Sequence, residues 1–369
     1  MRIVHLVRAT SWGGGERYAL DLCEQSVSRG HDVTVVTRGI PRMDKYFSHL
    51  PGKIKKMPLG GIFDMVSPVK LASLIKSFPE ERVVVHVHNF KDAEIVARAK
   101  YLVGNKKKVH LVVTRHLVRR GKKSLRWKFI YAGIDRLLFV SQLAKNEFLS
   151  TQPLIASEKI RVVHNSIIFP EKYSEPVPVA EHEILNILYA GRVASEKGLD
   201  VLIRAMGQLK NLPVRLTVTG TGEKEYLTQL WKLSEEVGVS DRITWTGFAK
   251  DVYKEIRDGD ICVAPSIAKE SFGLTIIEFM SQGRPVITTS NGAQTEIITD
   301  GEDGILVEAG NVEALADAIR KLAEDSDLRH RIGEKGAETF RKRFSYDVFF
   351  KKIMEEYGCP RLKARGPRS

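Results

Sequence analysis

The segments IVHLV at residues 3–7, WGGGER at residues 12–17 and VTVVT at residues 33–37 define the first folding unit of this chain. The first and last are short apolar runs of the kind that form strands. A helical pattern from Tyr18 to Ser28 lies between them and follows the glycine loop. A strand, a glycine loop, a helix and a second strand in this order predict a βαβ unit with two parallel strands.

The same alternation continues along the rest of the chain. Further strands are expected at residues 83–87, 110–114, 137–140, 187–189, 214–218, 243–245, 261–264, 285–288 and 304–307. Their hydrophobicity is nearly continuous, which is typical of a parallel sheet covered by helices on both faces. The alternation is interrupted once, where Pro170, Pro176 and Pro178 stand among charged and polar residues, and this stretch is typical of a linker.

We therefore predict an α/β chain of two doubly wound, Rossmann-like domains facing across a cleft, with ligands at the carboxyl ends of the strands. The predicted bounds are 1–168 for the first domain, 169–184 for the linker and 185–343 for the second domain. Residues 344–369 are expected to form a helix that returns toward the first domain, followed by a basic tail.

The composition excludes several classes of protein. The chain has 369 residues, of which 43% are hydrophobic and 28% charged, so it is not mainly disordered. No apolar run approaches the ~18 residues of a membrane-spanning helix, and the charged N-terminus does not have the pattern of a signal peptide. Three widely spaced cysteines, Cys23, Cys262 and Cys359, favour a reducing compartment over a disulfide framework or a cysteine zinc site.

The charge is distributed unevenly. Residues 1–168 contain 30 basic and 13 acidic side chains, a net charge of +17, whereas the remaining residues contain 28 and 32, a net charge of −4. This asymmetry indicates an anionic partner for the first half, such as a membrane surface, a phosphorylated substrate or nucleic acid, although solubility alone could also account for it.

The segment from Arg98 to Lys128 concentrates this charge. It contains twelve basic residues without an acid, and Trp127, Phe129 and Tyr131 lie at its end. Basic residues beside aromatic ones suit an anionic membrane surface. A phosphorylated glycolipid acceptor or a solvated helix face would explain the segment as well.

Two loops have the composition of phosphate sites. Gly13-Gly14-Gly15 follows a strand and opens a helix, so its N–H groups could approach a phosphate, although a tight turn is an equal explanation. Arg192 and Lys197 share the strand-to-helix loop at residues 191–198, where they could flank a diphosphate or remain solvated.

The segment ESFGLTIIE at residues 270–278 places two carboxylates around the start of a helix. Ser271 could cap that helix and leave its first N–H groups to an anion. Glu278 falls about two turns into the helix among apolar residues, where it would need a partner, either a polyol ligand or a structural ion pair.

Two possible metal sites are rejected. Asp258-Gly259-Asp260 precedes the strand at residues 261–264, on the side away from the expected ligands. His86 and His88 would share one face of a strand, but two ligands fall short of a zinc site. We interpret His86 as strand packing and His88 as the histidine that faces the cleft.

Taken in order, these motifs resemble the retaining family 4 glycosyltransferases of the GT-B fold, over essentially the whole chain. The matching segments are GGGER at 13–17, GHDVTV at 30–35, HVHN at 86–89, TRH at 114–116, GRVASEKG at 191–198, GTGE at 220–223, TGF at 246–248, PS at 265–266, and the pair Glu270 and Glu278.

The resemblance implies a role for each matched position. The second domain would bind the donor: Arg192 and Lys197 would hold its diphosphate, Glu270 its sugar hydroxyls and Glu278 its ribose. The main chain at Gly247 and Phe248 would face the base, and N–H groups at Phe272, Gly273, Leu274, Gly14 and Gly15 would support the phosphates. His116 would lie beside the reacting centre, and Glu16 and His88 on the acceptor side.

The resemblance thus implies a metal-independent enzyme without a cofactor that transfers a sugar, with retention, from a nucleotide diphosphate sugar to a glycan or glycolipid hydroxyl. Lipopolysaccharide core or another cell-surface glycan is the expected product. The location would be cytoplasmic, peripheral on the inner face of the cytoplasmic membrane, with an anionic membrane surface as partner. The alternatives are a nucleic-acid-binding protein, although no nucleic-acid motif is found, and a nucleotide-sugar epimerase of the same fold.

Overall fold

The computed structural model describes residues 1–8, 10–11, 13–52, 54–60, 63–177 and 182–358. The chain divides into two compact units. Unit 1 contains residues 1–165 together with the C-terminal residues from Phe349, and unit 2 contains residues 166–348. Cys359 and the predicted basic tail lie outside the described residues.

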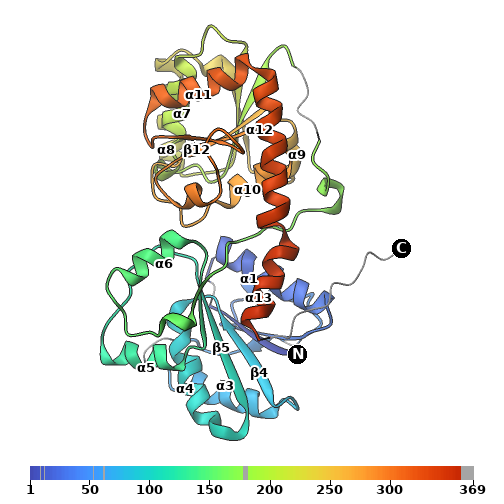
Figure 1. The fold of residues 1–369 in the computed structure, drawn as a ribbon, viewed down its shortest axis with the longest axis vertical. Helices are drawn as coiled ribbons and strands as arrows, with labels where there is room; N and C mark the ends of the chain where they lie inside the picture. Colours follow the sequence, from blue (N-terminus) through green and yellow to red (C-terminus); the bar gives the residue numbers. More distant parts are fainter. Residues whose placement is uncertain (9, 12, 53, 61–62, 178–181, 359–369) are drawn as a thin grey trace. The chain divides into compact units, whose positions relative to one another are not determined.

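Unit 1 is built on a parallel sheet with the strand order β3-β2-β1-β4-β5-β6-β7. Its strands β4 and β5 lie side by side in Figure 1. The strands are β1 (Arg2–Val7), β2 (Asp32–Thr37), β3 (Lys55–Lys56), β4 (Arg82–Val87), β5 (Lys108–Arg115), β6 (Arg136–Phe139) and β7 (Ile160–Val162). The helices are α1 (Gly14–Ser28), α2 (Pro41–Asp44), α3 (Val66–Ser77), α4 (Ala93–Val103), α5 (Leu125–Gly133) and α6 (Gln142–Leu149).

Both faces of this sheet are buried, because side chains alternate between the faces along each strand. Val4 and Leu6 belong to the core that includes residues of α3 to α6, whereas Val7 belongs to the core that includes residues of α1. His5 shares the second face with Val7, and its register partner on β4 is His86. The alternation thus places histidines of neighbouring strands on one face.

The C-terminal segment completes unit 1. Helix α13 (Tyr346–Glu356) crosses the division between the units, and Phe349, Phe350 and Ile353 are buried. The Arg82 guanidinium donates to the carbonyl oxygens of Tyr357 over 2.6 Å and Gly358 over 3.0 Å, which fixes the end of the helix against β4.

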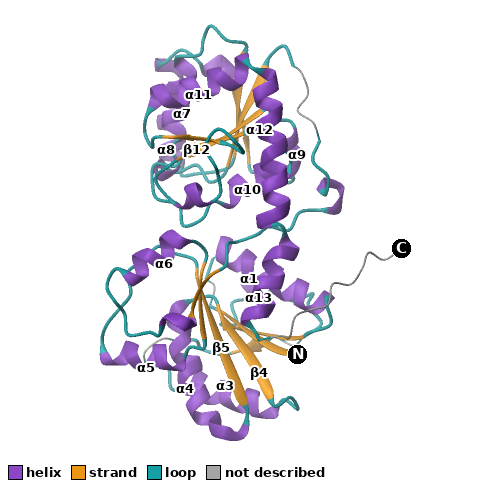
Figure 2. Ribbon diagram, viewed as in Figure 1, coloured by secondary structure: helices purple, strands orange, loops and turns teal. Residues whose placement is uncertain are grey.

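Unit 2 repeats the architecture, with strands between helices (Figure 2). Its strand order is β10-β9-β8-β11-β12-β13, and the strands are again all parallel. The strands are β8 (Leu185–Ala190), β9 (Val214–Thr219), β10 (Ile243–Gly247), β11 (Ile261–Ala264), β12 (Val286–Thr289) and β13 (Ile305–Val307). The helices are α7 (Leu199–Gly207), α8 (Lys224–Glu236), α9 (Val252–Arg257), α10 (Leu274–Ser281), α11 (Val312–Glu324) and α12 (Ser326–Thr339).

These two sheets confirm the predicted α/β fold of two doubly wound domains. In each sheet the order reverses direction beside the first strand, β1 or β8, so loops on either side of that point diverge and leave room for a ligand. Among the described residues, no helix combines the length and apolar composition that crossing a membrane requires.

Candidate active site

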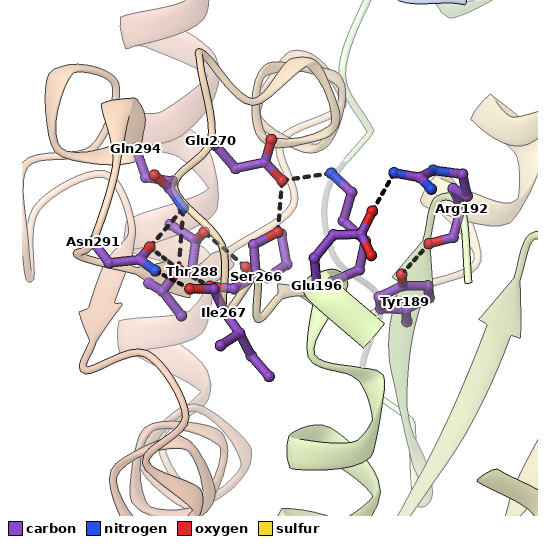
Figure 3. A network of polar contacts seen from close by, with 12 residues as sticks. Tyr189, Arg192, Glu196, Ser266, Ile267, Glu270, Thr288, Asn291 and Gln294 are labelled. Atoms are coloured by element: carbon purple, nitrogen blue, oxygen red, sulfur yellow. Dashed lines mark hydrogen bonds and ion pairs between the residues drawn. The ribbon is translucent and has the colours of Figure 1, made fainter. Parts of the chain in front are cut away.

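The cations predicted to bind a diphosphate lie between β8 and α7 of unit 2. Lys197 ends the 3₁₀ turn η5 (Ser195–Lys197), and its Nζ donates a hydrogen bond to Glu270 Oε1 over 2.5 Å. Ser266 Oγ donates to the same carboxylate oxygen over 2.6 Å (Figure 3). Because parallel strands end at one edge, the loops after β8 and β11 bring Lys197 and Glu270 together although 73 positions separate them.

Arg192 has a carboxylate partner of its own. Its Nη2 pairs with Glu196 Oε1 at 2.5 Å, and 64% of the Arg192 side chain is exposed (Figure 3). A backbone hydrogen bond, and then the Arg192 contact, lower the pKa of the Glu196 carboxyl. The two cations of the loop are therefore balanced by two carboxylates, and a diphosphate would have to exchange with them.

Glycines allow the loops of this site to approach closely. Gly198 has a φ of +70°, and a Cβ there would stand 2.1 Å from the carbonyl oxygen of Pro265. Gly220 has a φ of +144°, and a Cβ there would stand 1.7 Å from the carbonyl oxygen of Gly191. Both positions combine a backbone conformation suited to glycine with a lack of space for a side chain. The positions of the Lys197 loop and of its neighbour after β9 thus depend on these glycines.

The segment after β12 supports the Glu270 loop, and the sequence did not single it out. The Ala293 N–H donates to the Glu270 carbonyl over 3.1 Å, and Asn291 Nδ2 donates to the Ile267 carbonyl over 2.5 Å (Figure 3). Gln294 is fully buried and donates from Nε2 to Thr289 Oγ1 over 3.1 Å. The signal that could have found this segment is Ser290-Asn291-Gly292, a polar turn at the carboxyl end of a buried strand.

The expectation that Ser271 caps α10 is wrong. The residue in the cap position is Gly273, with a φ of +111°, and α10 begins at Leu274 without a side-chain cap. The left-handed glycine turns the chain into the helix two residues later than a serine cap would. The N–H groups of Gly273 and Leu274 are therefore at the helix start, where donors lack intrahelical partners.

The remaining donor-side residues lie near these loops in two groups. Phe272 is buried and Glu278 is half-buried on the second turn of α10. Gly247 ends β10 with a φ of +67°, its carbonyl accepts from the Gly220 N–H over 2.8 Å, and Phe248 beyond it is 79% exposed. The carboxyl ends of β8, β9 and β10 therefore form one continuous edge that includes Gly191, Gly220 and Gly247.

In unit 1 the predicted residues gather around the start of α1. Gly14 and Gly15 open this helix after Gly13, and Glu16 is half-buried on its first turn. A Cβ on Gly15 would stand 3.7 Å from Cδ2 of His116, which follows β5. The structure thus places His116 beside the glycine loop, and its place at the reacting centre stays a prediction.

His88 and His116 belong to a larger cluster of histidines. A hydrogen bond of 3.0 Å joins His5 Nδ1 to His88 Nε2, and the rings of His88 and His116 are stacked at 6.2 Å. Burial lowers the pKa of His5 to about 3 and of His116 to about 4, and it lowers the pKa of His86 and His88 in the same direction. All four imidazoles are therefore neutral near pH 7.

His5 supplies a third possible metal ligand that the sequence reasoning missed, because His5, His86 and His88 offer ring nitrogens within 4.8 Å of one another. Both nitrogens of His86 already bond hydroxyl groups, Nδ1 that of Tyr357 at 2.6 Å and Nε2 that of Thr114 at 2.8 Å. His5 and His86 are also fully buried. We interpret the group as a hydrogen-bonded cluster, and the expectation of a metal-free site stays a prediction.

The carboxylates Asp258 and Asp260 make structural contacts. Asp260 accepts from the Asn186 N–H over 2.7 Å and pairs with His182 at 2.9 Å, whereas Asp258 pairs with Lys254 at 3.1 Å. Both precede β11 and lie at the opposite edge of the sheet from Glu270.

Comparison with known proteins places these features in one family. A model described as "Glycosyltransferase Family 4" matches residues 12–168, and one described as "Glycosyl transferases group 1" matches residues 175–339. In the solved structures, Anabaena Alr3699/HepE in complex with UDP matches with a TM-score of 0.80 and 19% identity, over 97% of this chain and 100% of that one.

Two curated relatives match different lengths of the chain. The lipopolysaccharide core biosynthesis glycosyltransferase LpsE of Rhizobium meliloti is 34% identical over 162 residues, which are 44% of this chain and 46% of that protein. The N-acetyl-alpha-D-glucosaminyl L-malate synthase of Bacillus anthracis is 25% identical over 366 residues, 94% of this chain and 93% of that protein. The match thus spans less than half of LpsE and nearly all of the synthase.

The fold and these matches define a glycosyltransferase of the GT-B type. Within that class, the chain belongs to the family 4 glycosyltransferases, because the model of that family matches residues 12–168 and the group 1 model follows it over residues 175–339.

Proposed function

We propose that the protein is a retaining, metal-independent transferase that moves a sugar from a nucleotide diphosphate sugar to a hydroxyl of a glycan or glycolipid. The observation that carries the proposal is the contact of Lys197 with Glu270 beside Arg192 at one sheet edge. Two cations that can hold a diphosphate there stand next to a carboxylate that can accept hydrogen bonds from sugar hydroxyls.

In the proposed reaction the bond between the anomeric carbon and the diphosphate oxygen breaks, and a bond to the acceptor oxygen forms on the same face of the sugar. The acceptor hydroxyl loses its proton to the leaving diphosphate. Arg192, Lys197 and the N–H groups at the start of α10 offset the charge that develops on the diphosphate. With these groups in place the reaction needs no divalent cation, and no cofactor takes part.

The relatives support a choice of donor and acceptor classes to test. Alr3699/HepE, which shares this fold, was solved in complex with UDP. LpsE is named for lipopolysaccharide core biosynthesis. We therefore take a uridine nucleotide sugar as the first donor to test and a lipopolysaccharide core or other cell-surface glycan as the product.

A thermal-shift screen of nucleotide sugars, followed by acceptor-dependent transfer, tests this function. A donor at about 100 times its Kd should stabilise the protein by about 2.7 kcal/mol. Stabilisation without any transfer, together with donor conversion in the absence of acceptor, would favour an epimerase of the same fold. A gel shift with RNA or DNA and no response to any nucleotide sugar would favour a nucleic-acid-binding protein.

We also propose that unit 1 binds an anionic membrane from the cytoplasmic side. The structure changes which of the twelve basic residues can take part. Lys107 donates to the Phe78 carbonyl over 2.6 Å, Lys100 pairs with Asp135 at 2.6 Å, and the Arg115 guanidinium lies 4.7 Å from the Phe90 ring centroid. These three cations have intramolecular roles.

Arg98 and Arg126 pair with Glu94, and Arg120 pairs with Glu147. The remaining cations lie at the two ends of β5. Lys106 and Lys108 are at its amino end, whereas the exposed Lys122 and Lys123 follow its carboxyl end. More exposed apolar side chains accompany the second group, with Leu125 84%, Leu117 55% and Phe129 47% exposed, than the first, with Tyr101 81% and Leu102 44% exposed. We define residues 117–129 as the basic–apolar segment, and it combines the charge and apolar area that a membrane surface attracts.

Two variants with equal loss of charge test this surface. Lys122→Gln/Lys123→Gln should weaken binding to liposomes that contain anionic lipid about tenfold or more, at about 1 kcal/mol per lysine. Lys106→Gln/Lys108→Gln removes the same charge at the other end of β5 and should bind nearly as the wild type does. Equal losses in both variants would show that net charge alone governs binding and would reject the segment.

A further inference from the structure

The hydroxyl of Tyr357 forms the most buried polar contact between the C-terminal segment and the sheet of unit 1. It lies 2.6 Å from His86 Nδ1, and both residues are fully buried. The other ring nitrogen of His86, Nε2, lies 2.8 Å from Thr114 Oγ1 on the neighbouring strand β5. One imidazole thus connects the end of the C-terminal helix to two strands that carry site histidines.

The chemistry of the three groups sets the direction of these hydrogen bonds. His86 is neutral, so one ring nitrogen carries a proton and the other is an acceptor. A phenol is more acidic than an aliphatic hydroxyl, so Tyr357 is the better donor and Thr114 the better acceptor. We therefore assign Tyr357 O–H as donor to His86 Nδ1, and His86 Nε2–H as donor to Thr114 Oγ1.

The hydrogen bonds of His86 lead to residues that were assigned to the site. The ring of His88 packs on that of His86 with centroids 4.4 Å apart, and Thr114 stands two residues before His116. Tyr18 OH lies 3.5 Å from Thr114 Oγ1, and the Tyr18 ring meets the His116 ring edge-on at 4.8 Å. A change in the proton position on His86 would therefore reach both His88 and the Thr114–Tyr18–His116 contacts.

The position of the Tyr357 hydroxyl is itself fixed by several contacts. Besides the bonds from Arg82 to the last carbonyls, the Glu356 carbonyl lies 2.8 Å from His110 Nε2 on β5. Arg136 on β6 pairs with the Glu356 carboxylate at 2.9 Å. Side chains of β4, β5 and β6 thus hold the segment that presents the hydroxyl.

From these contacts we propose that Tyr357 is a positioning residue, which sets the tautomer of His86 and thereby holds His88 and His116 in place for transfer. The proposal rests on the proposed function for its catalytic part only. The tautomer itself can be measured on the protein alone.

The experiment compares Tyr357→Phe with the matched variant Tyr131→Phe. Tyr131 is also buried in unit 1, and its hydroxyl donates to the Lys122 carbonyl over 3.1 Å. Tyr131→Phe therefore measures how much stability is lost when a buried phenol hydroxyl is removed at a distance from the histidines. Three properties are measured in each variant: the ¹⁵N shifts of the His86 ring, the affinity for the nucleoside diphosphate, and kcat and KM for transfer.

In the wild type we expect the His86 ¹⁵N pattern of an Nε2–H tautomer. In Tyr357→Phe the Nδ1 atom loses its donor, and Thr114 can bond Nε2 as acceptor or as donor, so the ¹⁵N shifts should move from the Nε2–H pattern toward an average of the two tautomers. We expect kcat to fall about tenfold, which corresponds to about 1.4 kcal/mol in the barrier. Diphosphate affinity and donor KM should change less than kcat does, since the cations Arg192 and Lys197 belong to unit 2 and only the N–H groups of Gly14 and Gly15 would reach the phosphates from unit 1. Tyr131→Phe should lower the melting temperature to a similar degree with kcat and tautomer unchanged.

Thr114→Val provides a second test, because it removes the hydroxyl that bonds His86 Nε2. The double variant Tyr357→Phe/Thr114→Val should lose no more kcat than the worse single variant, since both substitutions disrupt the same pair of hydrogen bonds to His86. Additive losses, or an unchanged His86 tautomer in Tyr357→Phe, would overturn the proposal. If the wild type transfers no sugar but the His86 tautomer still changes in Tyr357→Phe, the result would count against the proposed function alone.

Discussion

Glu270→Gln separates the two roles assigned to the donor loop. The substitution keeps the size of the side chain and one oxygen but removes the charge that Lys197 contacts at 2.5 Å. The side chains of Lys197 and Glu270 are 28% and 22% exposed, and a partly exposed pair of this kind contributes about 0.2–1 kcal/mol. Stability should therefore change by less than about 1 kcal/mol.

Ligand binding and turnover should change in opposite directions in this variant. The nucleoside diphosphate competes with Glu270 for Lys197, so its affinity should stay level or rise up to about fivefold, the equivalent of the lost pair. Turnover should fall about 10²-fold or more, because an acceptor for sugar hydroxyls in the transition state is weakened. Lys197→Met is the control and should weaken diphosphate binding by about 1.5–3 kcal/mol through loss of a charge-assisted bond.

Isothermal titration calorimetry with the nucleoside diphosphate and steady-state transfer kinetics measure the two effects. If Glu270→Gln and Lys197→Met weaken diphosphate binding equally, Glu270 acts on the phosphates and its assignment to the sugar is wrong. An unchanged kcat in Glu270→Gln would also refute the assignment of Glu270 to the donor sugar.

Three further predictions concern the loops, the histidines and the metal. Gly198→Ala should reduce diphosphate affinity at least about tenfold, because its Cβ would meet the Pro265 carbonyl. Gly310→Ala is the control, since Gly310 has a similar φ of +79° and its added Cβ would have no atom within 4 Å; it should cost about 1 kcal/mol of stability and leave diphosphate affinity intact. Unit 1 should lose stability as the pH falls below 6.5, because burial lowers the pKa of four histidines, to about 3 for His5 and about 4 for His116, so the unfolded chain binds protons that the folded chain does not. Burial also raises the pKa of Asp21 to about 6 and of Asp92 to about 7, which offsets part of this loss but concerns only two groups. Urea unfolding across pH 4–8 checks this, with a slope of up to about 1.4 kcal/mol per pH unit for each histidine. Transfer should continue in excess EDTA, and loss of activity that Mn²⁺ restores would contradict the metal-free mechanism.

The central strands could be predicted because each is an apolar run buried on both faces, and the glycine loops because they follow such runs. The edge strand β3 could not, since it consists of Lys55 and Lys56, both exposed, and pairs only through its backbone. The cap of α10 was wrongly predicted for a related reason. A serine side chain is a recognised cap, but the positive φ of Gly273 that begins the helix is a backbone property the sequence does not display.

Parts of the site depend on pairings between distant segments. His5 has no motif of its own, and its place in the histidine cluster follows from the register that sets it opposite His86. The basic stretch from Arg98 to Lys128 resembled one surface, but β5 runs through it and separates Lys108 from Lys122. Tyr357 lies far from every motif, and only the packing of α13 on unit 1 brings its hydroxyl to His86.

The most direct test of the assigned activity is ¹H NMR of the reaction, following the anomeric signals of the nucleotide sugar that the thermal-shift screen selects. The account predicts that the donor signal declines only when an acceptor is present, and that the product signal has the coupling constant of the donor's own anomeric configuration. Inverted product, or donor consumption at the same rate without an acceptor, would contradict it.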